Sequence, residues 1–398
     1  MKRTKSIFLI FILSLALVVA SSPIIKKAVA EDVIKIGMTC DLTGPVAVYG
    51  IQGSAGAKAY FNYINDTGGL NGKKLVLLAE SDEFKPEKTL AAAKKLVERD
   101  KVFCFVSNIG TSCNAAIIPY FEKKKVLNVG PMAGASSTWG PKFDYTFVVF
   151  TSRELYGRIE VDYIVNELNM KNAKIVHIRT DEETGLTAAR GVVKQVEFYN
   201  KKGYGIKVVS EIPYKYRTTD FTSHILKAMQ AKPDILILTG YHPPVVRLAK
   251  EVERQGMKVQ LVIDPAACDP KLYKHAGSAV EGAIVNAVNP DINSDEPGVV
   301  EHRRLMKKYF PKLKPTTNSL QGALGAKLFV VAAKKLGNKE LTTENLKNML
   351  ESGEGFVTGI QPPLVFSKTN HLGVNKTLLY KVRNGKFVKA KDWVAPIE

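Results

Sequence analysis

The residues with the clearest chemistry in this sequence form a glycine-led helix start, Gly110-Thr111-Ser112, which follows an apolar run at 102–106 after three intervening residues. Backbone N–H groups in the first turn of a helix lack partners within the helix and carry partial positive charge. With the hydroxyls of Thr111 and Ser112 beside them, these groups can hold a carboxylate. The alternative interpretation is that the two side chains only cap the helix.

The motifs of common enzyme classes are absent from the sequence. The six histidines lack the spacing of zinc ligands. Gly72-Lys73-Lys74 lacks the hydroxyl residue of a phosphate-binding loop, and the glycines at 37 and 44 lack the spacing of a dinucleotide site. There is also no G-x-S-x-G nucleophile motif. We therefore expect a binding protein rather than an enzyme, with no metal and no cofactor.

The segments that must position Thr111 alternate between short apolar runs and runs of helical period. In the first part of the chain we expect strands at 33–39, 74–79, 102–106 and 126–129 and helices at 53–66, from 86 and at 112–124. The rhythm restarts after residue 150, with strands expected at 174–178, 206–212, 234–238 and 260–263. Ile235-Leu236-Ile237-Leu238 is apolar throughout, which is typical of a parallel strand buried on both faces. Repeated strand–helix–strand units predict an α/β protein with doubly wound parallel sheets, and Asn384-Gly385 predicts a hairpin near the end.

The first thirty residues have the features of a secretory signal peptide. Three basic residues precede an apolar run at 7–20, which is too short to cross a ~30 Å hydrocarbon core. Ala28-Val29-Ala30 offers small residues for cleavage before Glu31. We therefore expect a periplasmic or otherwise extracytoplasmic protein, with an uncleaved membrane anchor as the alternative.

Cleavage leaves 52 basic and 38 acidic residues, a net charge of +14. The lysines are scattered, with no arginine-rich run and no zinc-finger spacing, so we expect no nucleic-acid partner. In an oxidising compartment the four cysteines can form disulfides, with three full pairings open, or remain buried free thiols. They are Cys40, Cys104, Cys113 and Cys268.

Five motifs occur in register along the first part of the chain, and a sixth follows in the second. They are residues 43–50 (TGPVAVYG), 64–75 (INDTGGLNGKKL), the pair Asp82 and Pro86, Gly110-Thr111-Ser112, 130–134 (GPMAG) and 239–243 (TGYHP). In order and spacing the chain resembles the leucine/isoleucine/valine-binding protein family, the extracytoplasmic substrate-binding proteins of ABC importers. The resemblance covers essentially the whole chain after residue 30.

The resemblance implies a type I periplasmic binding fold, with two doubly wound parallel-sheet lobes joined by three crossing segments and closing on a ligand. The implied first lobe comprises residues 31–151 and 284–372. The implied second lobe comprises residues 152–283 and 373–398.

The resemblance also implies a ligand site. Thr111 matches a serine that contacts the ligand carboxylate in the family, with Gly110 and Ser112 beside it. Tyr49 and Tyr241 match aromatic positions of the family's site, although packing on a neighbouring helix is an equal alternative for Tyr49.

The part of the site that holds the ligand amine departs from the family. Met132 and Gly134 supply main-chain groups there, but Gly134 replaces a threonine hydroxyl. Thr184 stands where the family has an aromatic residue before a glycine. The acid that pairs with the ligand ammonium aligns with Pro265, next to Asp264.

Tyr156 is a candidate replacement for the lost aromatic, with an ordinary helix tyrosine as the alternative. We therefore expect a branched-chain or other hydrophobic amino acid as ligand, and an aromatic or aliphatic organic acid next. The resemblance implies a monomer that delivers its ligand to ABC permease subunits at the membrane. The alternative is a sensory module of the same fold that signals to a membrane receptor.

Overall fold

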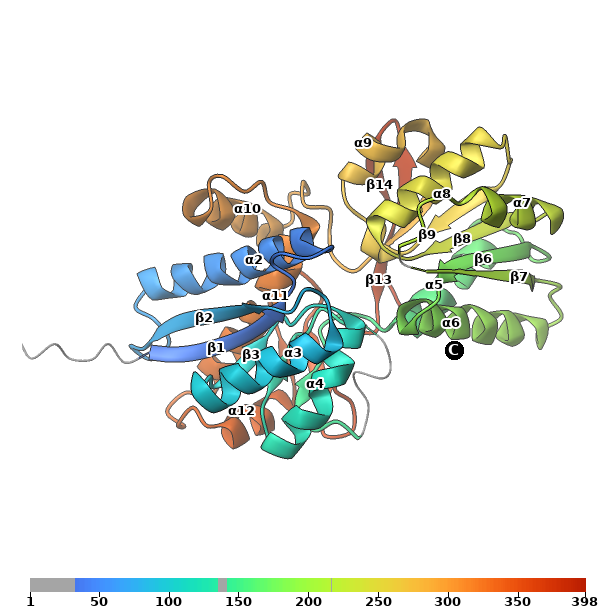
Figure 1. Ribbon diagram of the computed structural model, residues 1–398. Helices are drawn as coiled ribbons and strands as arrows, with labels where there is room; N and C mark the ends of the chain where they lie inside the picture. Colours follow the sequence, from blue (N-terminus) through green and yellow to red (C-terminus); the bar gives the residue numbers. More distant parts are fainter. Residues whose placement is uncertain (1–32, 135–141, 216) are drawn as a thin grey trace, which may run out of the picture. The chain divides into compact units, whose positions relative to one another are not determined.

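The computed structural model describes residues 33–134, 142–215 and 217–398. The expected signal peptide at 1–30 and its cleavage before Glu31 lie outside the described residues. No helix in the described ranges is long and apolar enough to cross a membrane. The described chain forms two large sheets, each flanked by helices, and a small two-stranded sheet (Figure 1).

The first large sheet has five strands in the order β2-β1-β3-β4-β5. They are β1 (Val33–Cys40), β2 (Lys74–Ser81), β3 (Cys104–Val106), β4 (Asn128–Val129) and β5 (Thr146–Phe147). The pairs β1–β3, β3–β4 and β4–β5 are parallel. Because these strands run in one direction, the segments that follow them meet at one edge of the sheet, where open α/β sheets bind ligands.

Helices cover both faces of this sheet. Cys104 and Val106 of β3 face a cluster with α2 (Ala47–Asp66), α10 (Pro297–Tyr309), α11 (Thr317–Lys335) and α12 (Thr343–Leu350), whereas Phe105 faces α3 (Pro86–Lys94) and α4 (Thr111–Lys124). A π-helical turn, Lys95–Arg99, extends α3. Strands β11 (Ser352–Phe356) and β12 (Leu364–Ser367) form the small sheet.

Helices α2 and α11 approach so closely that glycines are required where they meet. A Cβ on Gly56 would lie 1.8 Å from the carbonyl oxygen of Ser319, and one on Gly322 would lie 2.0 Å from that of Gly53. Real Cβ atoms do not approach that closely, so larger residues there would push the helices apart. This packing fixes α2, whose first turn carries Tyr49.

The second large sheet has seven strands in the order β14-β13-β10-β9-β8-β6-β7. They are β6 (Lys174–Thr180), β7 (Lys207–Tyr214), β8 (Ile235–Thr239), β9 (Gln260–Ile263), β10 (Ile284–Ala287), β13 (Thr377–Arg383) and β14 (Lys386–Val394). The first five strands of this list are parallel, β13 pairs antiparallel with β10, and β14 pairs antiparallel with β13. Asn384 and Gly385 both have positive φ, as the expected hairpin between β13 and β14 requires.

Strand β8 shows why its sequence is apolar throughout. Ile235 and Ile237 face a cluster that contains α5 (Arg153–Asn166) and α6 (Glu183–Asn200). Leu236 and Leu238 face a cluster that contains α7 (Thr222–Gln230), α8 (His242–Arg254) and α9 (Lys271–Ala276). All four side chains are fully buried, so the expected doubly covered parallel strand is confirmed.

The chain passes three times between the two sheets. It leaves the first sheet after β5, returns after β10 and crosses again between β12 and β13. The first and third crossings pair with each other, since Val148 N donates to His371 O at 2.9 Å and Gly373 N donates to Val148 O at 2.8 Å. The protein therefore has the expected α/β fold of two doubly wound lobes joined by three crossing segments.

The lobe limits at 151/152 and 372/373 stay a prediction. The limit at 283/284 assigns β10 to the first lobe, whereas β10, which begins at Ile284, pairs with β9 and so belongs to the seven-stranded sheet. All four cysteines are buried free thiols, which decides between the two interpretations left open by the sequence.

Candidate ligand-binding pocket

A pocket of about 750 Å³ lies at the carboxyl ends of strands from both sheets. The segments after β1 to β5 supply one part of its wall, and those after β8 and β9 supply another. Much of the lining is apolar and includes Val46, Phe84, Ile109, Phe150, Val246 and Val288. A concave, mostly apolar site with a few polar groups is the usual form of a small-molecule pocket, for which ~300–1,000 Å³ is typical.

The structure brings seven of the ten residues expected at the site to the pocket wall. They are Tyr49, Gly110, Thr111, Met132, Gly134, Tyr156 and Tyr241. Ser112, Thr184 and Asp264 are not among the lining residues. Thr184 lies behind Tyr241, with which its side chain hydrogen-bonds.

Helix α4 begins at the pocket with backbone donors that have no partner within the helix. Gly110 is its N-cap, with φ +97°, and the first helical bond runs from Asn114 N to Gly110 O at 2.9 Å. The N–H groups of Thr111, Ser112 and Cys113 therefore precede the helical ladder and have no partner within it. Those N–H groups and the Thr111 hydroxyl form a place where an anion can bind.

A buried chain of amide side chains holds the start of α4 against the sheet. Asn108 Oδ1 accepts from Thr39 N at 2.7 Å, and Asn108 Nδ2 donates to Asn128 Oδ1 at 3.0 Å. Asn128 Nδ2 then donates to Asn114 Oδ1 at 3.2 Å. The three asparagines are fully buried. Fully paired buried amides fix geometry, so they tie β1, β3, β4 and α4 into one rigid base under Thr111.

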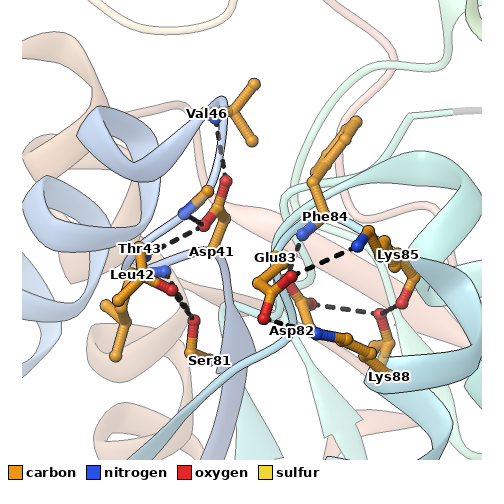
Figure 2. A network of polar contacts seen from close by, with 12 residues as sticks. Asp41, Leu42, Thr43, Val46, Ser81, Asp82, Glu83, Phe84, Lys85 and Lys88 are labelled. Carbon is orange, nitrogen blue, oxygen red and sulfur yellow. Dashed lines mark hydrogen bonds and ion pairs between the residues drawn. The ribbon is translucent and has the colours of Figure 1, made fainter.

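Two aspartates organise the loop that precedes α2 and the loop that carries Phe84 (Figure 2). Asp41 follows β1, and its carboxylate accepts from Thr43 N at 3.1 Å and Val46 N at 2.8 Å. Asp82 follows β2 and accepts from Phe84 N at 2.9 Å. The side-chain acceptors replace the missing backbone partners of these tight loops.

Phe84 contacts the opposite wall of the pocket. Its backbone is left-handed, with φ +56°. Its ring lies edge-on to Tyr241, with centroids 6.1 Å apart and ring planes at 90°. Edge-to-face contact is a favoured geometry for aromatic pairs.

An ion pair occupies the end of the pocket where an ammonium partner was expected. Arg153 is the first residue of α5 and lines the pocket, and its Nη1 donates to Asp264 Oδ2 at 2.7 Å. The other oxygen of Asp264 accepts from Ala266 N at 2.8 Å. The side chains are 13% and 2% exposed, respectively. Both carboxylate oxygens of Asp264 are therefore engaged by the protein.

Further titratable groups surround Arg153. Burial raises the pKa of Glu160 to about 8, with the charge of Asp264 as the next cause. Burial also raises the pKa of Glu182, against the lowering effects of Arg153 and a hydrogen bond from Tyr241. The Arg153 Nε is buried and has no hydrogen-bond partner within the described chain. Arg153, a lining residue, thus has one buried donor that no described residue pairs.

The wall contributed by α8 and α9 is strongly basic. Its lining includes Arg247, Lys250, Lys271 and Lys274. Among the described lining residues, Asp269 is the one carboxylate. The described residues contain no group of three or more His, Cys, Asp or Glu side chains that could hold a metal. The charge of the lining therefore favours an anion.

The sequence signalled some of these groups and missed others. Asp82 and Pro86 mark the loop that carries Phe84, but nothing in their spacing showed that the ring would reach Tyr241. Arg153 had no signal, since it is one basic residue among many. The role of the asparagines depends on strands far apart in the chain.

Comparisons with known proteins give consistent matches. The family model for periplasmic binding proteins matches residues 33–386. The Leu/Ile/Val-binding protein homolog 1 of Brucella abortus is 25% identical over 321 residues, which cover 80% of this chain and 82% of that protein.

Two solved structures have similar folds. A branched-chain amino acid ABC transporter from Thermus thermophilus with bound valine matches with a TM-score of 0.82 and 20% identity, over 92% of this chain and 97% of that chain. A fatty acid ABC transporter substrate-binding protein from Thermomonospora curvata matches with a TM-score of 0.80 and 23% identity, over 92% of this chain and 93% of that chain.

Proposed function

Because the chain belongs to the periplasmic binding protein family, we propose that it is the extracytoplasmic substrate-binding component of an ABC importer. It captures a small ligand with a carboxylate and an apolar body and delivers it to permease subunits. The observation that carries this proposal is the start of α4, which places Thr111 and N–H groups without a partner in the helix at an apolar pocket.

The chemistry of the pocket supports a ligand with these two parts. A carboxylate placed at the N-terminus of α4 gains hydrogen bonds and a favourable interaction with the helix dipole. The apolar side chains around it favour burial of a hydrocarbon or aromatic group. Amino acids with hydrophobic side chains and organic acids share this chemistry. The two structural matches illustrate both classes, since one contains bound valine and the other is a fatty acid ABC transporter substrate-binding protein.

The three crossing segments support a capture mechanism in which the lobes close on the ligand. A ligand favours closure only through its greater affinity for the closed form. Small-angle X-ray scattering should then show a smaller radius of gyration once a verified ligand is added. An unchanged profile at saturating ligand would contradict closure, while leaving ligand binding itself intact.

The function is tested by a thermal-shift screen of the purified protein over amino acids and organic acids, followed by calorimetry. We expect at least one carboxylate to bind and its neutral amide to bind much more weakly. Loss of hydrogen bonds to a charged group costs about 1.5–3 kcal/mol, which is roughly 10–150-fold in affinity. Equal binding of acid and amide would show that the carboxylate is not what the protein recognises.

A further inference from the structure

We infer that the ligand is an apolar carboxylate without an α-ammonium group. The reason is that Arg153 forms an ion pair with Asp264, the acid that would otherwise pair with the ammonium. This inference rests on the proposed function and specifies its substrate class. It selects an aliphatic or aromatic organic acid over the amino acid with the same side chain.

Both carboxylate oxygens of Asp264 already have partners within the protein. Its Oδ2 accepts from the guanidinium of Arg153 at 2.7 Å, and its Oδ1 accepts from the backbone of Ala266 at 2.8 Å. The side chain is 2% exposed and is not part of the pocket lining. A ligand ammonium would have to displace the guanidinium in order to reach this carboxylate, leaving a buried arginine without its partner.

Arg153 itself disfavours an ammonium group in the pocket. It lines the pocket, and its Nε is a buried donor without a partner in the described residues. An ammonium has no lone pair to accept that hydrogen bond, and it is repelled by the guanidinium charge. An oxygen or an apolar carbon of the ligand meets neither obstacle.

The other described acids near the pocket do not replace Asp264. Glu160 is 2% exposed, and neither it nor Glu182 is among the lining residues. Glu182 also accepts a hydrogen bond from Tyr241 and faces the charge of Arg153. Asp269 does line the pocket, but it shares that wall with Lys271 and Lys274.

The decisive experiment compares matched pairs of ligands. Calorimetry on the purified protein uses carboxylic acids of four to ten carbons, each beside its α-amino counterpart. Examples are 4-methylpentanoate with leucine and 3-phenylpropanoate with phenylalanine. We expect the best acid to bind at least tenfold more tightly than its amino counterpart. An amino acid that binds as tightly as its matched acid would overturn the inference and leave the proposed function standing.

Variants of Arg153 test the cause of the preference. Arg153→Met frees Asp264, so the amino acid should gain at least fivefold relative to the matched acid. Arg153→Gln keeps a polar side chain in case the methionine variant does not fold. If the ratio stays unchanged in both variants, Arg153 is not the selecting group and the inference fails. The wild-type comparison needs no variant to be decisive.

Arg179→Met is a matched control. Arg179 is 11% exposed and its Nε donates to Glu211 at 2.9 Å, so the variant also breaks a half-buried ion pair in the seven-stranded sheet. Arg179 is not part of the pocket lining, so the acid-to-amino-acid ratio should not change. If no acid or amino acid of the series binds to the wild type, both the proposed carboxylate capture and this inference are contradicted.

Discussion

The ring of Phe84 lies edge-on to that of Tyr241, with 6.1 Å between centroids and 90° between planes. Phe84 follows β2 of the five-stranded sheet and Tyr241 follows β8 of the seven-stranded sheet. Both residues line the pocket. This pair therefore connects two walls that are built by different sheets.

Replacing Phe84 should separate ligand affinity from stability. Phe84 has φ +56°, which costs a non-glycine residue about 1 kcal/mol. Phe84→Gly removes both the ring and this strain, whereas Phe84→Ala removes only the ring. We expect both variants to lose several-fold in ligand affinity, with Phe84→Gly at least as stable as Phe84→Ala in urea unfolding. A more stable alanine variant would show that the left-handed backbone carries no strain.

Two substitutions at Thr111 should separate its hydroxyl from its backbone N–H. Thr111→Ala removes the hydroxyl and should weaken carboxylate binding by roughly 2–10-fold. Thr111→Pro removes the N–H as well and should weaken binding by roughly 10–150-fold. Proline is tolerated at the first helical position, so the fold should survive. Circular dichroism checks the fold and calorimetry the binding; wild-type affinity in the proline variant would place the anion elsewhere.

Gly110→Ala should disturb the pocket more than the fold. Gly110 has φ +97°, and an added Cβ would lie 2.6 Å from Cε2 of Phe84. The ring can rotate away, but only by changing the pocket wall. Gly256 is a control with φ +65° and open space around the Cβ position. We expect each alanine variant to lose ~1–2 kcal/mol of stability from its positive φ, while only Gly110→Ala loses ligand affinity.

Glu160 should make the protein less stable as the pH rises. Its pKa is raised from 4.5 to about 8, chiefly by burial, so the folded protein keeps a proton that the unfolded chain releases between these values. The folded state then binds more protons, and the free energy of unfolding falls as pH increases from about 5 to 8. Glu160→Gln should flatten this part of the profile, by up to about 1.4 kcal/mol per pH unit. Parallel profiles for wild type and variant in denaturant unfolding would contradict the assignment.

The four cysteines should be unreactive until the protein unfolds. They are 0–7% exposed, and burial raises the pKa of Cys40 and Cys113 to about 12. Thiolate is the reactive form, so a disulfide reagent at pH 8 should label none of the cysteines in the native protein and all four in guanidinium. Rapid labelling of a native cysteine would show that its surroundings open readily.

The fold was predictable because its elements follow local rules. Doubly buried strands such as β8 and the Asn384-Gly385 turn have signals within a few residues. Helix α2 begins at Ala47, six residues before the expected start. The first turns were not predicted because glycines such as Gly50 and Gly53 have low helix propensity. A Cβ on Gly50 would lie 1.8 Å from the carbonyl oxygen of Asp41, and Gly56 is required by the approach of α11, a helix more than 250 residues later in the chain. A contact at that distance leaves no local signal.

The candidate site was predictable only in part. The start of α4 was visible because a glycine before hydroxyl residues has a local meaning. Asp264 was identified as an acid at the right position, but its state depends on Arg153, 111 residues earlier. The chain of buried asparagines was not predictable either, because it joins residues from β1, β3 and β4, which lie far apart in the sequence. Partners of this kind are fixed by topology rather than by neighbouring residues.

The pairing of the first and third crossing segments also bears on how the chain reaches its native state. The hydroxyl of Thr151 donates to the carbonyl of Lys376, 225 positions later. The backbone of Val148 likewise hydrogen-bonds with that of His371 and Gly373. Neither lobe is a continuous stretch of sequence, so an amino-terminal fragment cannot complete either one. Contacts between such distant residues form late and slowly, because loop closure costs entropy before the contact repays it. The protein should therefore acquire its native structure only after nearly the whole chain is available, and until then its apolar strands stay open to chaperones.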